Sequence, residues 1–503
     1  MSVPKRARLP RRAPRWLPRR PLGRARGAVA CAAATVVVGL LGPGGTAVAQ
    51  PSTSTDAFNS LTSQSHPDWM GGASDALGLG NMSLPGTHDT LAIHGGSLFP
   101  SAYEAQENHG DSAATLTAQL NAGIRAIDIR VRVVNGGTAF AIHHSDVYQN
   151  ANFDDVLART RDFLSAHPTE TVLMNLHGEC DADTTEGGSG SGSIGHCADD
   201  PSNTTTEDRT RIFNGYVSRY PGLFYAPTVT GNSTAATPTL GQTRGRIVLT
   251  QFTGPRGQVY GGYGLTQLTS GDWGQYVEND WTQCGLDTKW TEARANLAKA
   301  AGDSSGALYI TYTSANCAPF GATPADVAGG YGGGSGLDQR TLDYLSDGGS
   351  GRTGILMTDF PGHGLIAAII RRQPGGLSGS VSSGLTGKCL DAYGGSDSSG
   401  TKADLWTCNG SAAQHWTAAA DGSVRIGGAC LDVTGGSSAD GALLQLWTCT
   451  GGANQRWTQG AGGRLISDQS GKCLDVPGSS TTDGAQLEIW TCHGGANQQW
   501  FLR

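Results

Sequence analysis

The sequence has no hydrophobic run long enough to span a membrane, and it has few basic residues outside its first 26 positions. The apolar stretch from Ala28 to about Leu41 is shorter than the roughly 20 residues that a membrane-spanning helix needs. The first 26 residues hold ten Lys or Arg and no acidic residue. Without those ten, 25 basic residues remain against 42 acidic ones, a formal net charge near −17. This excess of acidic residues argues against nucleic acid as a partner.

The order of features in residues 1–49 is typical of a secretory signal peptide. A basic segment comes first, a short apolar segment follows, and Ala47-Val48-Ala49 supplies small residues for cleavage after Ala49. The arginine pairs Arg11-Arg12 and Arg19-Arg20 lack a clear twin-arginine context, so the export route stays open. We therefore expect a secreted, extracellular protein.

The last 120 or so residues repeat one pattern three times. Each copy opens with Cys-Leu-Asp, has a second cysteine 19 positions after the first, and closes with Gln-x-Trp. The copies open at Cys389, Cys430 and Cys473 and close at Trp416, Trp457 and Trp500. A repeat of about 40 residues cannot bury its own apolar face, so neighbouring copies must share one core. Three copies predict a closed threefold barrel in which the closing tryptophans are buried and structural.

With this spacing, the segment from about Leu377 to Arg503 resembles the ricin-type β-trefoil lectin family. The resemblance implies a sugar site in each lobe, where an aromatic ring stacks on a sugar face and polar groups fix its hydroxyls. Lobe two carries the full set of Asp432, Gln445, Trp447, Asn454 and Gln455. Lobe three carries Asp475, Glu488, Trp490, Asn497 and Gln498.

Lobe one departs from the family's set. It carries Asp391, Asp404, Trp406 and Gln414, but Ala413 stands where Asn is expected. We therefore expect galactose-type or related sugars to bind most strongly in lobe two, more weakly in lobe three, and marginally or not at all in lobe one. A trefoil that serves only as scaffold is the alternative.

Cysteine usage agrees with export. Of eleven cysteines, Cys31 lies in the leader and six form the pairs within the three lobes, which leaves Cys180, Cys197, Cys284 and Cys317. An even set in an exported chain favours disulfides over free thiols. A bridge from Cys180 to Cys197 would close a Gly/Ser loop, and Cys284 would then pair with Cys317.

Residues 50–372 have the length of one large domain. Residues 373–383 are rich in Gly and Ser and are expected as a linker, with the trefoil over 384–503. β-branched runs predict strands at 124–134, 138–143, 171–176, 246–251, 308–313 and 355–360, and residues 153–167 present one apolar helical face. Strand, helix, strand order predicts an α/β barrel. A doubly wound sheet is the alternative, but no Gly-x-Gly-x-x-Gly follows the first strand.

Polar residues gather where the predicted strands end, which in such a barrel is the edge that carries the active site. They are His88, Asp89, Asp128, Arg130, His143, His144, His177, Glu179, Asp280 and Asp359. Two histidines with carboxylates to orient them can deprotonate a hydroxyl and protonate a leaving alkoxide. An arginine fork suits a phosphate group.

The segment from Met82 to His177 resembles the X region of phosphatidylinositol-specific phospholipases C, especially the secreted, metal-independent bacterial branch. It carries Pro-Gly-Thr-His-Asp, Asp-Ile-Arg and His-His in the family's order and close to its spacing. The resemblance implies a distorted TIM-type (β/α) barrel and a phosphoric diester hydrolase or lyase. The implied reaction cleaves phosphatidylinositol-type lipids to diacylglycerol and a cyclic inositol phosphate, which is then hydrolysed more slowly.

The resemblance also implies a role for each polar residue. His88 is the expected general base, oriented by Asp359, and His144 is the expected general acid, supported by Asp89. Arg130 would stabilise the phosphate with Asp128 behind it. The head-group residues are less regular: Asp280 fits an inositol-binding carboxylate, whereas His177 replaces a family Lys and Phe252 an expected Arg. The same chemistry on a different head group is therefore an alternative.

We expect no cofactor, because a fixed guanidinium at Arg130 would stand where the calcium-dependent branch of the family holds its cation. A calcium-dependent enzyme with His177 and Glu179 as ligands stays open as the alternative. The expected protein is a monomer that acts on lipid at a membrane surface and is tethered to a glycan. The alternative hypothesis is a carbohydrate-binding protein with an inactive barrel. The presence of His88, His144 and Arg130 argues against it, because packing a barrel requires neither histidines nor arginine.

Overall fold

A computed structural model describes residues 54–95, 100–134, 137–145, 147–179, 204–226, 229–230, 237–250, 265–266, 276–318, 320–346 and 351–502. The predicted signal peptide, the Cys180–Cys197 bridge and Phe252 fall outside these residues, as does the side chain of His177. In the described part of the chain, no helix combines the length and apolar character that crossing a membrane requires.

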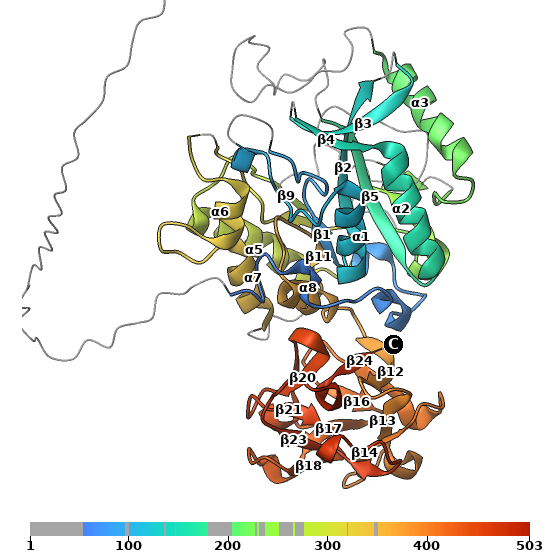
Figure 1. Cartoon of the computed structure of the whole chain (residues 1–503), viewed down its shortest axis with the longest axis vertical. Coiled ribbons are helices and arrows are strands. Elements are labelled where there is room, and N and C mark those ends of the chain that lie inside the picture. Colours follow the sequence, from blue (N-terminus) through green and yellow to red (C-terminus); the bar gives the residue numbers. More distant parts are fainter. Residues whose placement is uncertain are drawn as a thin grey trace, which may run out of the picture. The chain divides into compact units, whose positions relative to one another are not determined.

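The N-terminal domain alternates strands and helices (Figure 1). Its strands are β1 (Ser83–Thr87), β2 (Ala126–Val134), β3 (Ala139–His144), β4 (Val147–Asn152), β5 (Thr171–Gly178), β6 (Val229–Thr230), β7 (Arg246–Leu249), β8 (Leu265–Thr266), β9 (Val277–Glu278), β10 (Ile310–Tyr312) and β11 (Gly354–Thr358). Its helices are α1 (Ser112–Ala122), α2 (Phe153–Ala166), α3 (Thr206–Arg219), α4 (Leu240–Thr243), α5 (Leu286–Gly302), α6 (Pro324–Gly329), α7 (Leu337–Ser346) and α8 (His363–Ile370). All six predicted strands and the predicted helix are present, with slightly different ends.

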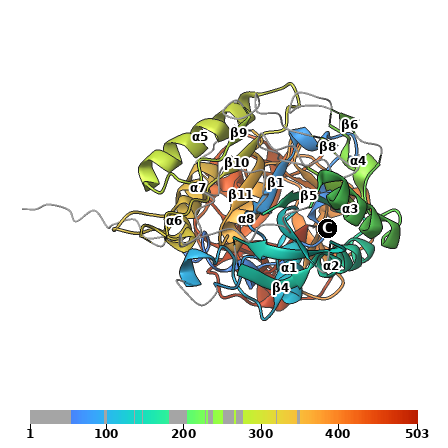
Figure 2. The ribbon, with the colours of Figure 1, turned by 90° about the horizontal axis from the view of Figure 1, so that it is seen from above.

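A run of parallel strands in the order β7-β5-β2-β1-β11-β10-β9 forms the centre of this domain. The C-terminal part of β2 (Val131 to Val134) also pairs with the antiparallel strand β3, which in turn pairs with β4. Helices α2, α3, α5 and α7 lie around the outside of the curled sheet (Figure 2). The predicted α/β barrel class is confirmed, in a distorted form whose sheet is mixed. Because parallel strands end at one edge, residues that follow them converge there.

β1 shows why this sequence accepts a Pro-Gly pair inside a central strand. An added Cβ at Gly86 would lie 2.5 Å from Met357 Sδ and 3.0 Å from Ala126 Cβ. Only glycine therefore allows β1 to lie so close to both β2 and β11. The close packing holds the residues after Thr87 at the carboxyl edge of the sheet.

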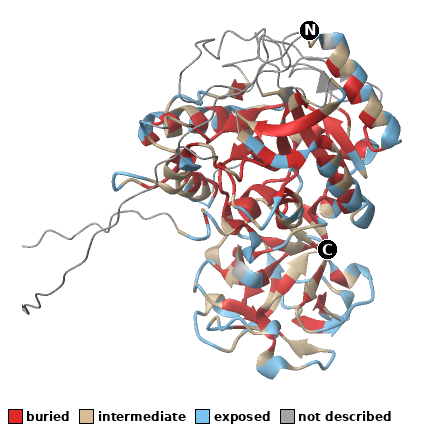
Figure 3. Ribbon diagram, turned by 45° about the horizontal axis from the view of Figure 1, so that its top comes forward, coloured by how far each residue is buried: buried red, intermediate tan, exposed pale blue. Residues whose placement is uncertain are grey.

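Burial follows the sheet. Residues on the central strands are mostly buried, while the outer faces of the helices are exposed (Figure 3). α2 illustrates the pattern, because Val156, Leu157, Phe163 and Leu164 are buried on one face. Asn152 begins this helix with a capping box, accepting hydrogen bonds from Asp154 N and Asp155 N.

The C-terminal domain is an antiparallel β structure with a core of its own. Its strands are β12 (Leu377–Ser383), β13 (Lys388–Ala392), β14 (Ala403–Thr407), β15 (His415–Ala418), β16 (Val424–Ile426), β17 (Ala429–Val433), β18 (Ala442–Thr448), β19 (Trp457–Gly460), β20 (Arg464–Ser467), β21 (Cys473–Asp475), β22 (Ala485–Gln486), β23 (Glu488–Trp490) and β24 (Trp500–Leu502). The three closing tryptophans are at most 2% exposed. Each donates its indole N–H to the carbonyl of the leucine in its own Cys-Leu-Asp at 3.0–3.1 Å. Their predicted structural role is confirmed.

The predicted linker over 373–383 is wrong for most of its length. Leu377–Ser383 forms β12, which pairs with β15 on one side and β24 on the other and so joins the first and last parts of the trefoil. Gln373 is buried and exchanges hydrogen bonds with the backbone of Ser83. Small residues suggested a flexible segment, but their alternate burial in β12 is that of a strand.

Four disulfides lie among the described residues. Cys389–Cys408, Cys430–Cys449 and Cys473–Cys492 each close a lobe, and Cys284–Cys317 lies in the N-terminal domain. All four were predicted and are confirmed.

Candidate active site

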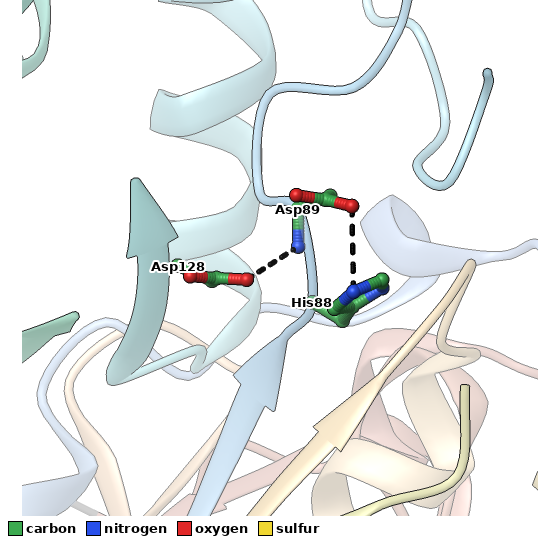
Figure 4. A group of neighbouring side chains, drawn as sticks. All are labelled: His88, Asp89 and Asp128. Carbon is green, nitrogen blue, oxygen red and sulfur yellow. Dashed lines mark hydrogen bonds and ion pairs between the residues drawn. The ribbon is translucent and has the colours of Figure 1, made fainter. Parts of the chain in front are cut away.

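The turn after β1 carries His88 and Asp89. The backbone N–H of His88 donates to Thr358 O at 3.0 Å, which ties the turn to the end of β11. Asp89 has φ of 43°, in the left-handed region. Its backbone N–H donates to Asp128 Oδ2 at 3.2 Å, and its carboxylate lies beside the His88 ring (Figure 4). A non-glycine residue in this conformation is held by its surroundings, as functional turns often are.

Asp359, which follows β11, orients the His88 ring. His88 Nδ1 donates to Asp359 Oδ1 at 3.0 Å, and Gln106 Nε2 donates to the carbonyls of His88 at 2.6 Å and Thr358 at 3.1 Å. The Tyr312 ring lies edge-on to the imidazole at a centroid distance of 5.8 Å. The predicted pairing of His88 with Asp359 is therefore present, although the two residues lie 271 positions apart.

Arg130, on β2, lies among three carboxylates. Its Nε donates to Asp89 Oδ1 and, at 3.2 Å, to Asp128 Oδ2. Nη1 donates to Glu179 Oε2 at 3.3 Å, and Nη2 contacts His88 Nε2 at 2.8 Å. This contact is a hydrogen bond only when the His88 ring is neutral with its proton on Nδ1, whereas the protonated ring directs its Nε2–H to Asp89 Oδ2 at 3.3 Å.

His144, at the end of β3, is fixed from both ring nitrogens. Nδ1 donates to the Tyr103 carbonyl at 2.8 Å, and Nε2 lies 3.2 Å from Asp89 Oδ2. The same Asp89 oxygen lies 3.3 Å from His88 Nε2. Asp89 therefore joins both histidines and Arg130 in one network, as the predicted support for His144 requires.

Burial and charge oppose each other at these groups. Burial lowers the pKa of His88, but Asp89 and Asp359 outweigh it and raise the pKa to about 9. Burial works against ionisation of Asp89, yet Arg130 and the two histidines hold its pKa below the ordinary value. Burial also raises the pKa of Asp359, although His88 opposes this. The site thus keeps Asp89 ionised between three positively charged or protonatable groups.

One trio of residues has the donor atoms of a cation site. His88, Asp89 and Asp128 place ligand atoms within 4.8 Å of one another. In this structure Arg130 Nε bonds to both of these carboxylates. The guanidinium supplies positive charge at the place where these oxygens would direct a metal ion.

Other predicted residues lie elsewhere. His143 is buried and its ring packs against Tyr148 at a centroid distance of 5.6 Å. Asp280 is exposed and accepts from Thr282 N at 3.1 Å and Oγ1 at 2.7 Å, so its carboxylate bonds within its own turn. It lines a cavity of about 570 Å³ together with Trp281 and Glu278.

Three site residues had no signal in the sequence, namely Tyr103, Gln106 and Tyr312. Tyr103 contributes its backbone carbonyl and a ring that lies edge-on to the His144 ring at a centroid distance of 6.1 Å, and the Gln106 side chain donates to two backbone carbonyls. Glu179 was predicted as a possible metal ligand, and the structure instead pairs it with Arg130 and with Ser145 N at 2.6 Å. The backbone of His177 lies opposite Arg130 in the β2–β5 register.

The predicted sugar residues of lobe two form one bonded set. Asp432 Oδ1 accepts from Gln445 Nε2 at 3.0 Å, and Oδ2 accepts from Asn454 Nδ2 at 2.7 Å and Gln455 Nε2 at 2.9 Å. Trp447 stands beside them with 43% of its surface exposed. Three amide donors thus hold one carboxylate beside an open aromatic ring.

The other lobes keep part of this set. In lobe three, Asp475 Oδ2 accepts from Asn497 Nδ2 at 2.9 Å, with Glu488 opposite it. In lobe one, Asp391 Oδ2 accepts from Gln414 Nε2 at 2.9 Å, with Asp404 opposite it. The exposed rings are Trp490 in lobe three and Trp406 in lobe one.

Comparisons with known proteins agree with this architecture. Residues 82–187 match the family model "Phosphatidylinositol-specific phospholipase C, X domain", and residues 377–500 match "Ricin-type beta-trefoil lectin domain". A 1-phosphatidylinositol phosphodiesterase of Listeria monocytogenes is 26% identical over 315 residues, which cover 63% of this chain and 86% of that protein. One from Staphylococcus aureus strain Newman is 25% identical over 330 residues, covering 62% of this chain and 93% of that protein.

Among solved structures, the phosphatidylinositol-specific phospholipase C from Listeria monocytogenes is 23% identical and has a TM-score of 0.46. The match covers 62% of this chain and 100% of that one. The two family matches identify a segment similar to the phosphatidylinositol-specific phospholipase C X domain, at residues 82–187, and a segment similar to the ricin-type β-trefoil lectin domain, at residues 377–500.

Proposed function

We propose that this chain is a secreted phosphodiesterase that cleaves phosphatidylinositol-type lipids at a membrane surface and attaches to a glycan through its trefoil. The observation that carries the proposal is the shared contact of His88 and His144 with Asp89 beside Arg130. Two histidines at one carboxylate and one guanidinium provide a base, an acid and a phosphate ligand in a single site. The relatives named 1-phosphatidylinositol phosphodiesterase support the same reaction.

The reaction is an internal attack by the substrate. His88 Nε2 takes the proton of the inositol 2-hydroxyl as that oxygen bonds to phosphorus. The bond from phosphorus to the diacylglycerol oxygen breaks, and His144 gives this oxygen a proton. The products are diacylglycerol and a cyclic inositol phosphate, which water opens in a slower second step. Because the nucleophile belongs to the substrate, the site has only to orient it and move protons.

Arg130 connects substrate binding to the state of His88. In the structure its Nη2 lies 2.8 Å from His88 Nε2, the atom that must accept the substrate proton, and its positive charge favours the neutral ring against Asp89 and Asp359, which raise the pKa of His88. A phosphate that draws the guanidinium toward itself frees this nitrogen. Asp359 still holds Nδ1–H, so the ring keeps the orientation and the tautomer that a base needs.

The proposed reaction needs no metal. The guanidinium already bonds to Asp89 and Asp128, the oxygens that a cation would use. A cation there would have to displace Arg130 and would meet its positive charge.

The experiment is an assay of the purified protein on phosphatidylinositol vesicles, with and without excess chelator, in which phosphate-containing products are followed over time. We expect equal rates in both, with the cyclic phosphate formed first. Loss of activity with chelator and recovery with calcium would reverse the assignment of Arg130. Release of the acyclic phosphate without a cyclic intermediate would refute the reaction, and no product at all would leave an inactive barrel.

A different phosphodiester head group is the second candidate, because His177 and Phe252 depart from the family's residues. A panel of vesicles that differ only in head group separates the two. We expect the highest rate on phosphatidylinositol.

Export and glycan attachment rest on separate observations. The leader pattern of residues 1–49 and the four disulfides support an oxidising destination. We expect mature protein that begins at Gln50, to be checked by N-terminal sequencing from culture medium. The bonded set around Asp432 supports sugar binding, to be tested on a glycan array.

A further inference from the structure

The three lobes place two polar positions directly opposite each other on paired strands. The pairs are Asp391 with Asp404 in lobe one, Asp432 with Gln445 in lobe two, and Asp475 with Glu488 in lobe three. Opposite residues of antiparallel strands share a face, with Cβ atoms roughly 4.5–5.5 Å apart. The first position is Asp in every lobe. The second is Asp in lobe one, Gln in lobe two and Glu in lobe three.

In lobe two the second position is a donor. Gln445 Nε2 donates to Asp432 Oδ1 at 3.0 Å, while Asn454 and Gln455 donate to Oδ2. A carboxylate at the Gln445 position has no hydrogen to give, and only its protonated form can donate.

In lobe one the second position is a buried acid. Asp404 is 0% exposed, and among the described residues neither of its oxygens has a hydrogen-bond partner. Its neighbour Asp391 is 5% exposed and accepts from Gln414 Nε2 at 2.9 Å. Two buried carboxylates side by side repel each other when both are ionised, and one shared proton removes the repulsion and supplies a donor.

The charged groups around Asp404 come from three neighbouring segments. Asp391 lies on β13, Lys402 directly precedes β14, and Asp483 precedes β22. Burial and then Asp391 raise the pKa of Asp404 to about 7, Asp483 adds to the rise, and Lys402 opposes it. Asp483 is itself paired with Lys388 Nζ at 2.6 Å. The proton on Asp404 therefore exchanges near neutral pH.

We propose that lobe one is a sugar site gated by one proton: protonated Asp404 donates to Asp391, as Gln445 donates to Asp432, and the doubly ionised pair does not bind. The ligand is a neutral hexose unit of a polysaccharide, which stacks on Trp406, a ring that is 37% exposed. The proposal rests on the proposed glycan binding by lobe two. Lobe one has Ala413 at the position where lobe two has Asn454. It therefore lacks that amide and, even when Asp404 is protonated, binds more weakly than lobe two.

The test measures galactose affinity by tryptophan fluorescence in the full chain. Asp432→Ala with Asp475→Ala leaves lobe one as the only lobe that keeps the aspartate of its Cys-Leu-Asp. Since only the protonated fraction binds, affinity should fall about 30-fold from roughly pH 5.5 to roughly pH 8.5. An affinity that does not change with pH would overturn the proposal.

Two matched variants isolate the proton. Asp404→Asn, added to the Asp432→Ala, Asp475→Ala variant, supplies a permanent donor. Its galactose affinity at every pH should equal the affinity that the double variant shows at about pH 5.5. Gln445→Glu, in a chain whose intact set is lobe two (Asp391→Ala with Asp475→Ala), should introduce a pH dependence that lobe two otherwise lacks. Loss of acidic binding in Asp404→Asn would show that the amide does not replace the proton and would refute the proposal.

A readout without sugar separates this proposal from glycan binding itself. The folded-state pKa of Asp404 is raised from 3.8 to about 7, so its contribution to stability is full below about pH 3.8 and is lost as pH rises through about 7. Asp404→Asn should therefore raise the thermal unfolding midpoint at about pH 8 and leave it unchanged near pH 4. If the Asp391→Ala, Asp475→Ala variant binds no galactose, the proposed glycan binding fails for galactose. The unfolding midpoints still test whether Asp404 carries a proton. An equal shift of the unfolding midpoint at both pH values would refute the proposed protonation of Asp404.

Discussion

The two domains use a buried aspartate in different ways. In the N-terminal domain, Asp89 contacts His88, His144 and Arg130, so one carboxylate serves three positively charged or protonatable groups in a single network. In the trefoil, an equivalent aspartate occurs three times, and in lobe two neutral amides hold it. The first arrangement moves charge and protons, and the second fixes acceptors for neutral hydroxyls.

The two domains should respond differently to the loss of one side chain. Groups in one network are coupled, so removing one member disturbs all the others. Repeated lobes are separate sites, and several weak sites on one body gain by engaging a polysaccharide together. We therefore expect abrupt losses in the N-terminal domain and graded losses in the trefoil.

The largest effect is expected from His88→Ala and from His144→Ala. Each should reduce turnover on phosphatidylinositol by about 10² to 10⁴, because each residue carries a separate proton transfer. The measurement is the initial rate of cyclic phosphate release, with circular dichroism to confirm the fold. Asp432→Ala is the matched control and should leave this rate on soluble substrate unchanged. Near-normal activity in either histidine variant would refute the two-histidine mechanism.

Arg130→Lys should lower turnover by about 10² to 10³, which is typical for loss of one group that stabilises the charge of the transition state. A lysine keeps the charge but loses the fork that reaches Asp89, Asp128 and Glu179 together. The assay is repeated with added calcium. Rescue by calcium would confirm that the guanidinium takes a cation's place, and an unimpaired variant would show that the fork is dispensable.

A smaller effect should separate the lobes. Asp432→Ala removes the acceptor of three amide donors, and each donor left unpaired costs about 1–3 kcal/mol. It should therefore weaken attachment to a polysaccharide more than Asp391→Ala does at about pH 8. Retention of the full chain on a polysaccharide column reports the difference. Equal losses would refute the ranking of the lobes, and no binding by the wild-type trefoil would leave it as scaffold.

The smallest effect concerns stability against pH, where the domains should differ in their windows. The pKa of His88 is raised from 6.5 to about 9, so its contribution is full below about pH 6.5 and is lost as pH rises through about 9. The unfolding midpoint of the wild type should fall over this range more than that of His88→Gln. Asp404 in the trefoil loses its contribution at lower pH, as pH rises from about 3.8 through about 7. Parallel curves for the wild type and His88→Gln would contradict this separation.

Sequence patterns correctly predicted six strands of the N-terminal domain and helix α2, but did not predict other elements, such as β1, β4, α1 and α5. The strands with β-branched runs, such as β2, β5 and β11, appear where expected because their alternatives would expose apolar side chains. The linker prediction failed at β12 because Gly and Ser are typical of loops, while pairing with both β15 and β24 decides the matter here. β9 escaped notice because its two residues carry too short a pattern.

The threefold repeat, the disulfide spacings and the His-Asp, Asp-Ile-Arg and His-His motifs can be recognised from the order of residues alone. Which of these groups contact one another is seen only in the folded chain. In the fold, Glu179 pairs with Arg130, and Asp89 contacts His88, His144 and Arg130. The carboxylate of Asp280 bonds within its own turn, and Asp404 is buried opposite Asp391. The physical reason is that such contacts depend on strand register and on the packing of segments far apart in the chain, neither of which local sequence patterns encode.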